Sequence, residues 1–310
     1  MSRASVIAML VAAEILIAGM AIYTVGGRAS FTHGMQRVDF TPATIAPVAA
    51  GATPHVVIDD ASSRVSVTAS NDALVHVRDL TQIRGNVFST SKYPQLRVTR
   101  TSDGVRIERP AFGSLSMEIF SFSTEAIEVA VPGGSHVEIP HCSGADVNGI
   151  AGNVAVDSQD GHVTLRDMRG DVDARSDDGY LSLTDVTTGS LIARTHDGRI
   201  EARGLTVAGE RPNATLHSDD GSVHVAGAFA SNGAYEITSG DGSIELRLPS
   251  NADLAITAST GDGRIVLDGS SLDRDDSGQR TIRLGAGSSA MKLATSDGSI
   301  HILTNGASLQ

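Results

Sequence analysis

The sequence predicts an all-β fold: a single elongated parallel β-solenoid of stacked ~20-residue coils, with an irregular β region before it and one transmembrane helix at its start. A turn of the form Ser/Thr-x-Asp-Gly recurs through the second half of the chain. Apolar and polar residues alternate on both sides of each turn, as in half-buried strands. No long segment after the first 26 residues has helical apolar spacing, so the repeats are expected to be strands.

The amino-terminal segment is predicted to cross a membrane. Residues 4–25 are almost wholly apolar, and a helix needs ~20 such residues to span the hydrocarbon core. We interpret residues 1–26 as an uncleaved signal anchor, with a cleaved signal peptide as the alternative. Arg3 precedes the span, and its charge weakly orients the body outside the cytoplasm. Glu14 lies near the middle of the span, where it either faces a helical partner or is tolerated in a single helix.

Two regions precede the repeats. Residues 27–53 mix Pro, Ala and Thr without a sustained period and are predicted to form a flexible linker, with a partly ordered segment packed on the body as the alternative. Residues 54–136 alternate like strands but less regularly, which predicts an irregular β region. Within it, residues 78–93 and 110–124 are expected to be loops and the sites of specialised contact. Gly104 completes an Asp-Gly step that fits either a local hairpin or an irregular first coil.

Seven copies of the repeated turn fit one common frame. The turn glycines are Gly161, Gly179, Gly198, Gly221, Gly242, Gly263 and Gly298. The aspartates immediately before them are Asp160, Asp178, Asp197, Asp220, Asp241, Asp262 and Asp297. Successive glycines from the first to the sixth copy are 18, 19, 23, 21 and 21 residues apart. Self-similarity at this period is typical of stacked repeats.

Each repeat contains one alternating strand before Asp-Gly, one strand after it and a second glycine turn, as at Gly170 and Gly189. This pattern is one coil of a solenoid, in which equivalent strands of successive coils pair in parallel and bury a shared core. The repeats occupy residues 137–303, and residues 304–310 form a polar tail. A sandwich or jelly roll would also alternate, but it has no reason to repeat one turn at one offset.

Each repeated position has an expected structural role. Glycine permits positive φ at the turn, and the aspartate before it is expected to accept backbone N–H groups as a corner cap. Ser or Thr, three residues before the glycine, shares the inward parity and is expected to form a ladder of hydroxyl groups between coils. Apolar residues seven and five positions before the glycine, and two and four positions after it, should line the core.

The stacked aspartates also permit a cation ladder along the corner, because carboxylates ~5 Å apart repel unless they are hydrogen-bonded or bridged. Calcium-binding β-rolls need a nine-residue glycine frame that this sequence lacks, so the structural role is favoured. We assign no catalytic, cofactor-binding or metal-binding residue and expect no cofactor. The histidines occupy different offsets from their glycines and predict no metal site. The single cysteine, Cys142, lies beside His141, which could lower its pKa.

Composition narrows the possible partners. The formal charge of −12 argues against nucleic acid, because binding to phosphates needs clustered Lys and Arg. Aromatic residues make up 4% of the chain and Trp is absent, so the core must be built from Val, Ile, Leu and Ala. Aromatic platforms for sugar binding are correspondingly few.

The chain resembles the bacterial "putative adhesin" family of domains of unknown function, whose members carry Ser-x-Asp-Gly coils. Residues 126–135, Ala-Ile-Glu-Val-Ala-Val-Pro-Gly-Gly-Ser, are similar to the apolar strand, Val-Pro and glycine of that family. The resemblance covers the repeats to Ile302 and extends more loosely back to His55. It departs at 143–147, a coil without Asp-Gly that is expected to cap the stack, and at 272–278, an acidic insertion. The resemblance implies a β-solenoid outside the cytoplasm and implies no catalytic residues.

These observations favour a membrane-anchored, non-enzymatic module outside the cytoplasm, periplasmic or at the cell surface, that contacts an envelope polymer or protein. If the amino-terminal segment is cleaved, the module is secreted. A structural scaffold that stacks end to end is the first alternative. A carbohydrate-active enzyme is the second, and it would need paired carboxylates and sugar platforms.

Overall fold

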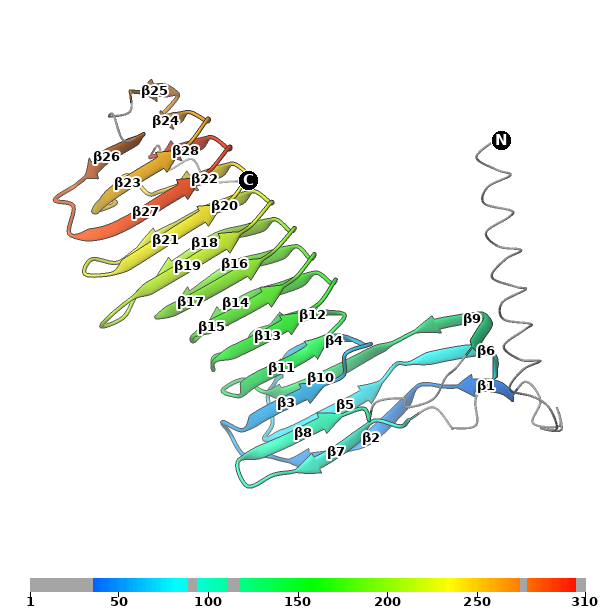
Figure 1. Ribbon diagram of the computed structural model, residues 1–310. Coiled ribbons are helices and arrows are strands. Elements are labelled where there is room, and N and C mark those ends of the chain that lie inside the picture. The colour runs from blue at the N-terminus through cyan, green and yellow to red at the C-terminus, as the bar shows by residue number, and fades with distance from the viewer. Residues whose placement is uncertain (1–35, 89–93, 111–116, 274–277, 305–310) are drawn as a thin grey trace, which may run out of the picture.

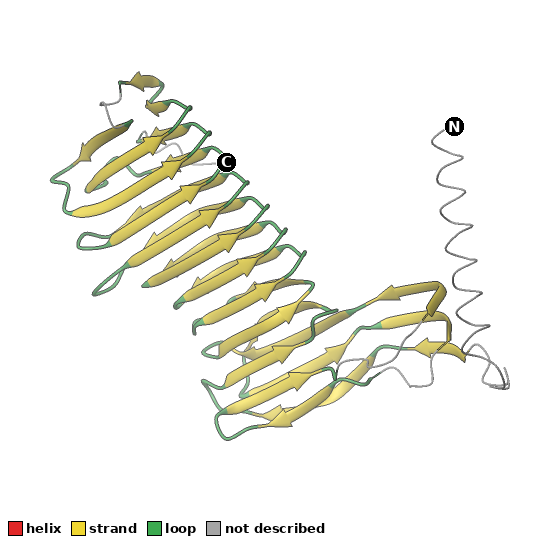
Figure 2. Cartoon of the chain, viewed as in Figure 1, coloured by secondary structure: helices red, strands yellow, loops and turns green. Residues whose placement is uncertain are grey.

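The computed structural model describes residues 36–88, 94–110, 117–273 and 278–304. Over these residues the chain consists of strands, turns and loops without a helix (Figure 2). The predicted anchor at 1–26 lies outside the described residues. Among the described residues, no helix has the length and hydropathy that crossing a bilayer requires.

The described strands form two large sheets and one small sheet. Sheet 1 comprises, in spatial order, β2 (Ala43–Ala49), β5 (Leu74–Asp79), β10 (Ala126–Pro132), β4 (Arg64–Ser70), β12 (Gly144–Asn148), β14 (Val163–Arg169), β16 (Leu181–Thr188), β18 (Ile200–Val207), β20 (Val223–Phe229), β22 (Ile244–Arg247), β28 (Ile300–Leu303), β24 (Ile265–Leu267) and β25 (Ser270–Leu272). Sheet 2 comprises β26 (Gln279–Leu284), β23 (Leu254–Thr260), β27 (Ser289–Thr295), β21 (Ala234–Ser239), β19 (Asn213–Ser218), β17 (Ser190–Thr195), β15 (Val172–Ser176), β13 (Val154–Ser158), β11 (His136–Cys142), β3 (His55–Asp59), β8 (Gly104–Glu108) and β7 (Arg97–Arg100). The projecting sheet comprises β1 (Gln36–Phe40), β6 (Gln82–Phe88) and β9 (Met117–Thr124).

One coil of the stack consists of a strand of sheet 2, an Asp-Gly corner and a strand of sheet 1, as in β15, Gly179 and β16. Equivalent strands of successive coils pair in parallel and in register, so that Val172 lies beside Leu191 and Leu181 beside Ile200. Figure 1 shows these coils stacked into an elongated body. The predicted all-β, largely parallel, solenoid-like architecture is confirmed.

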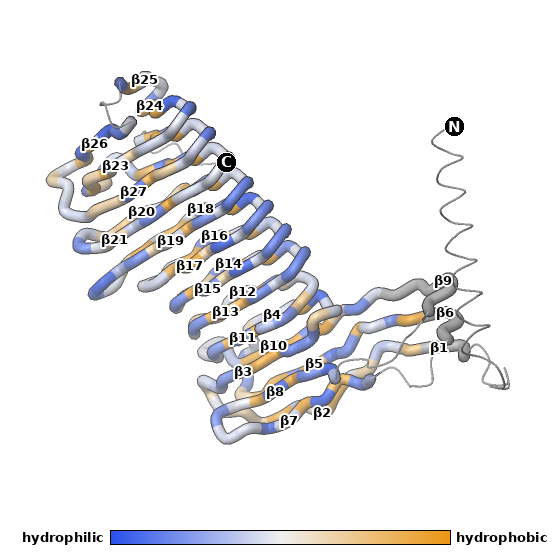
Figure 3. The backbone as a smooth tube through the Cα atoms, in the orientation of Figure 1, coloured by the Kyte–Doolittle hydropathy of each residue, from blue (hydrophilic) through white to orange (hydrophobic). Residues whose placement is uncertain are grey.

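The core lies between sheets 1 and 2 and follows the predicted parity. The residues two positions after the turn glycines are at most 1% exposed; they are Val163, Leu181, Ile200, Val223, Ile244, Ile265 and Ile300. Five positions before the glycines, Val, Ala, Leu and Ile side chains face them from sheet 2 and are also buried. Leu267 departs from the pattern and is only partly buried. Figure 3 shows hydrophobic residues along the strands and a hydrophilic edge where the corners stack.

The carboxyl-terminal coils do not stack in sequence order. The last strand pair, β27 and β28, lies between the coil of β21 and β22 and the coil of β23 and β24. The sequence analysis expected successive coils to be neighbours, and this expectation is wrong here. The strand order also departs from the sequence order at the other end of sheet 1. There β4 lies between β10 and β12 and pairs with both. Because β12 is paired on both sides, the coil at 143–147 is an internal coil and not the predicted cap.

Antiparallel strands close both ends of the stack. In sheet 2 the edge strands are β7, antiparallel to β8, and β26, antiparallel to β23. In sheet 1 they are β2, antiparallel to β5, and β25, antiparallel to β24. The Asp-Gly step at Gly104 forms the local hairpin, because the flanking strands β7 and β8 are antiparallel neighbours in sheet 2. β8 also pairs in parallel with β3.

The region before the repeats contains more strand than predicted. Part of the predicted linker 27–53 forms β1 and β2, and β2 is an edge strand of sheet 1. The segments 78–93 and 110–124, predicted to be loops, contribute β6 and β9, which pair with each other. With β1 they form an antiparallel sheet that projects sideways from the base of the stack (Figure 1). Period-two alternation is weak in these segments, which explains why the sequence analysis missed the strands.

A buried ion cluster ties the base of the stack together. The guanidinium of Arg109 donates to Asp60 Oδ2 at 2.7 Å and to Asp79 Oδ1 at 3.0 Å. It also donates to the carbonyl oxygen of Pro94 at 3.0 Å, and its Cζ lies 6.0 Å from the centroid of the Phe40 ring. The three ionic side chains are only 2–3% exposed. One guanidinium thus connects segments that are far apart in the sequence.

Candidate functional site

The turn glycines are required by close packing between coils and not by the predicted positive φ. None of the seven described turn glycines has φ in the left-handed region. A Cβ added at Gly198 would lie 1.8 Å from the carbonyl oxygen of Gly179, and one at Gly221 would lie 1.9 Å from that of Gly198. Every copy has such a contact, at 1.7–2.2 Å from a backbone oxygen of the neighbouring coil. The corner backbones therefore approach one another too closely for any side chain.

The Ser/Thr column forms the predicted hydroxyl ladder and also caps the corner. Ser218 Oγ donates to the carbonyl oxygen of Gly198 at 2.8 Å and accepts the N–H of Gly221 at 2.9 Å. The same pair of hydrogen bonds recurs at Ser176, Thr195, Ser239, Thr260 and Thr295. These side chains are buried, so each hydroxyl satisfies two backbone groups that solvent cannot reach.

The aspartates before the glycines do not have the predicted capping role. All seven are exposed, and among the described residues none of their carboxylates accepts a hydrogen bond from a backbone amide. They form a line of negative charge along the corner edge. Within the described part of the chain, no group of three or more His, Cys, Asp or Glu side chains is arranged to hold a metal ion.

The structure brings together two histidines that the sequence analysis treated separately. Asp219 Oδ2 lies 2.5 Å from His196 Nδ1, and Asp219 Oδ1 lies 2.9 Å from His217 Nε2. The hydrogen bond with Asp219 raises the pKa of His196, and nearby Asp197 adds to the effect. The hydrogen bonds with His196 and then His217 lower the pKa of the Asp219 carboxyl. His217 lies on β19 and His196 in the turn after β17, and the two come together because β17 and β19 are neighbours in the stack.

Cys142 does not have the reactive environment that a neighbouring histidine suggested. Its side chain is buried, and burial raises the pKa of the thiol. His141 points away from it and lies 3.0 Å from Asp59 Oδ1 through its Nδ1 atom. Adjacent residues of a strand face opposite sides of the sheet, which separates the two side chains.

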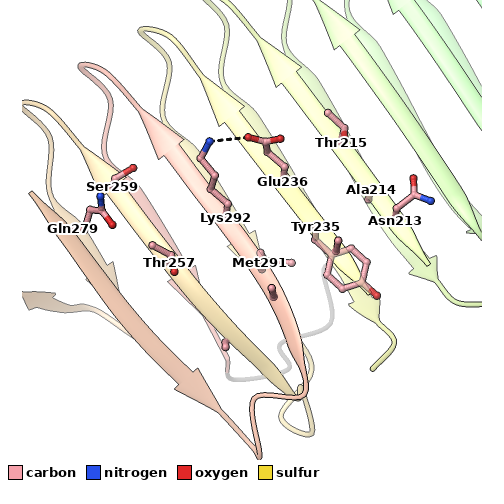
Figure 4. Close-up of a pocket in the computed structure, with 13 residues that line it drawn as sticks. Asn213, Ala214, Thr215, Tyr235, Glu236, Thr257, Ser259, Gln279, Met291 and Lys292 are labelled. Atoms are coloured by element: carbon pink, nitrogen blue, oxygen red, sulfur yellow. Dashed lines mark hydrogen bonds and ion pairs between the residues drawn. The ribbon is translucent and has the colours of Figure 1, made fainter. Parts of the chain in front are cut away.

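One surface feature that could not be predicted from the sequence is a groove on the outer face of sheet 2, which we call groove A. It has a volume of about 630 Å³ and crosses β19, β21, β27, β23 and β26 (Figure 4). Its short outward side chains include Ala234, Ala290 and Ala255, which occupy one register row on three adjacent strands. Asn213 and Gln279 also line it.

Groove A contains one ion pair. Lys292 Nζ lies 2.8 Å from Glu236 Oε1, with the Lys side chain 59% and the Glu side chain 45% exposed. These residues are paired in register on β27 and β21 (Figure 4). Glycoside hydrolysis normally uses two carboxyl groups, and Glu236 is the one carboxylate lining this groove among the described residues. The groove extends over five adjacent strands of sheet 2.

The insertion of the last coil places β27 in the middle of groove A. In sequence-order stacking, Glu236 would lie beside Thr257, because both stand six residues before their turn glycines. The observed order places Lys292 between them. The periodicity of the sequence does not indicate this change in strand order, and the groove could therefore not be predicted.

The outer face of sheet 1 has a different character. Glu201 accepts hydrogen bonds from Tyr180 Oη and pairs with Arg203, and Glu245 Oε1 pairs with Arg247 Nε at 2.6 Å. The depression between these groups has a volume of about 190 Å³. Long charged side chains thus fill this part of sheet 1, whereas short side chains leave groove A open. A larger depression on sheet 1, of about 500 Å³, is lined by Arg169, Asp185 and Thr187.

The chain is similar to one protein family and to solved structures. The family model described as Toastrack DUF4097 matches residues 54–303. One similar crystal structure is a "putative cell adhesion protein" from Clostridium sporogenes, with 9% identity and a TM-score of 0.28, covering 87% of this chain and 100% of that one. Another is a "putative adhesin" from Bacteroides fragilis, with 11% identity and a TM-score of 0.32, covering 84% of this chain and 97% of that one. No curated protein matches the chain.

Proposed function

The chain belongs to the Toastrack DUF4097 family, and on this premise we propose that it is an adhesin-like, non-enzymatic binding module that contacts an envelope polymer or protein through the outer face of sheet 2. Groove A is the observation that carries the proposal. It extends across five strands of a rigid sheet and is lined by short apolar, hydroxyl and amide side chains. A surface of this kind can follow an extended partner along the stack.

The proposed location is outside the cytoplasm, with the body tethered to the membrane. The proposal rests on the apolar segment 4–25 and on Arg3 before it. The net charge of −12 disfavours nucleic acid as a partner. Surface labelling of whole cells, combined with the amino-terminal sequence of the mature protein, tests both location and anchoring.

A binding role is favoured over an open-ended scaffold because of the ends of the stack. End-to-end growth would require parallel strand edges that a second copy could extend. The described edge strands β7, β26, β2 and β25 are all antiparallel to their neighbours, which interrupts that pattern. Sedimentation of the detergent-solubilised chain should show a monomer at all concentrations, and concentration-dependent polymers would favour the scaffold.

The binding role can be tested by filling groove A. Ala290→Arg places a long side chain on the groove floor, and Ala226→Arg is the matched control on the outer face of sheet 1. After chemical crosslinking in native envelopes, we expect the wild type and Ala226→Arg to retain the same envelope component, and Ala290→Arg to lose most of it. Equal retention by all three proteins would contradict a role for groove A.

A further inference from the structure

A second groove, groove B, lies on the outer face of sheet 2 nearer the base of the stack. It has a volume of about 610 Å³ and crosses β3, β11, β13, β15 and β17. Its lining includes the four carboxylates of Asp103, Glu138, Asp171 and Asp173. Neither Lys nor Arg is among its described lining residues, in contrast to groove A with Lys292.

Acidic and aliphatic side chains alternate along groove B. Glu138, Ala155, Asp173 and Ile192 occupy one outward register row on four successive strands of sheet 2. Parallel strands lie ~4.8 Å apart, so the two acidic positions in this row are separated by ~9.6 Å. Ala155 lies between the two acidic positions and Ile192 lies beyond Asp173, and both provide apolar contact area in this row.

The carboxylates of groove B are partly engaged by neighbouring groups and together leave an excess of negative charge for a cationic partner. Asp171 Oδ1 accepts the N–H of Ser190 at 3.0 Å, and its Oδ2 has no partner among the described residues. The hydrogen bond from Thr101 is the main cause of the lowered pKa of the Asp103 carboxyl, which therefore stays ionised. His55 lies between two of the carboxylates, with Nε2 3.1 Å from Glu138 Oε2 and Nδ1 3.5 Å from Asp103 Oδ2. Arg175 donates to both oxygens of Asp173, at 3.0 and 2.9 Å, and offsets one of the four charges.

We propose that groove B binds an extended basic peptide segment of a partner protein. The aliphatic stems of its Lys or Arg residues would lie on Ala155 and Ile192, and their charged heads would pair with Glu138, Asp171 and Asp173. A polyproline II segment with a cation at every third residue repeats every ~9.3 Å, close to the two-coil spacing of the acidic positions. This site goes beyond groove A, since it assigns a partner chemistry to a different part of the face.

The proposal is tested with a fluorescent lysine-proline-proline repeat peptide and the full chain in detergent, at physiological salt. The groove variant carries Glu138→Gln, Asp171→Asn and Asp173→Asn. The matched control removes the same charge at the exposed corner with Asp178→Asn, Asp220→Asn and Asp297→Asn. We expect the groove variant to bind the peptide at least about 10-fold more weakly than the wild type and the control to differ by less than about twofold.

A gain-of-function variant keeps the test informative if the triple variant folds poorly. Ala155→Glu adds a carboxylate between the two acidic positions and should tighten peptide binding severalfold. Equal weakening in the groove and corner variants would overturn the proposal, because the net charge alone would then explain binding. Absence of peptide binding by the wild type, or complete competition by equimolar spermidine, would also overturn it.

Discussion

At the residue scale, the close approach of the neighbouring coil leaves no room for a side chain at the repeated turn position, which therefore requires glycine. Gly198→Ala should destabilise the protein by about 1–3 kcal/mol, because its Cβ would lie 1.8 Å from a backbone oxygen that the neighbouring strands hold in place. Gly133→Ala is the control, since its Cβ would meet the nearest atom at 3.8 Å, and it should change stability by less than about 0.5 kcal/mol. Chemical denaturation measures both. Equal stability of the two variants would contradict the close-packing account.

The Ser or Thr hydroxyl, and not the aspartate, caps each corner, and this gives a second prediction. Ser218→Ala removes the partner of the Gly221 N–H and of the Gly198 carbonyl, both at a buried site, and should cost about 1–3 kcal/mol. Asp220→Ala should change stability by less than about 0.5 kcal/mol, because the side chain is exposed and caps nothing. Urea denaturation of the two variants should rank them in this order, and the reverse order would restore the aspartate as the cap.

The cluster of His196 and Asp219 predicts a pH dependence. Because the pKa of His196 is raised, its stabilisation is fully present below the ordinary value of 6.5 and is lost as the pH rises through the folded-state pKa. Because the pKa of Asp219 is lowered, its stabilisation is present above 3.8 and is lost as the pH falls through the folded-state pKa. The cluster therefore contributes most between these two values. In an NMR titration, Asp219→Asn should lower the pKa of His196, and an unchanged value would refute the pairing.

The apolar columns and the Ser/Thr ladder could be predicted from the sequence because each depends on side-chain parity, which period-two alternation reports directly. The reason for Gly179 or Gly198 could not, since positive φ and close backbone approach both select glycine. The role of Asp178 was misassigned for a similar reason. An aspartate beside a glycine often caps a turn, but here the hydroxyl three residues before the glycine occupies that position.

At the element scale, the insertion of β27 between β21 and β23 is the feature with the clearest test. Glu236→Cys with Lys292→Cys places two thiols on paired positions of adjacent strands, within disulfide distance. Glu236→Cys with Thr257→Cys is the control, with thiols two strands or ~9.6 Å apart. Mild oxidation should crosslink the first pair and not the second. Crosslinking of the second pair alone would show that the coils stack in sequence order.

Strand order at the ends could not be inferred from the repeats, because every coil presents the same corner and the same inward columns. The sequences around Gly263 and Gly298 fit equally well beside the coil of Gly242. The choice between them depends on the chain connections, including the antiparallel return through β26. The strands β6 and β9 were missed for a different reason, since antiparallel pairing with each other stabilises them without a regular apolar pattern.

At the scale of the whole molecule, the repeats provide a stiff platform and the outer faces differ in chemistry. Sheet 1 carries charged pairs such as Glu245 with Arg247 and a depression beside Arg169 and Asp185, whereas sheet 2 carries groove A and groove B. The buried cluster around Arg109 fixes the base on which both faces depend. Arg109→Met should destabilise the protein by about 3–5 kcal/mol, because it leaves Asp60 and Asp79 buried together without their cation. Thermal unfolding measures the loss, and a change below about 1 kcal/mol would contradict this role.

We propose that the outer face of sheet 2 is the binding surface. The most direct test of this proposal is photo-crosslinking in native envelopes from a reactive residue introduced singly at Thr215 or Thr257 on sheet 2, and at Ala226 on sheet 1. The account predicts one shared crosslinked partner from both positions on sheet 2 and none from the position on sheet 1. Crosslinks that arise equally from both faces, or only from sheet 1, would contradict it.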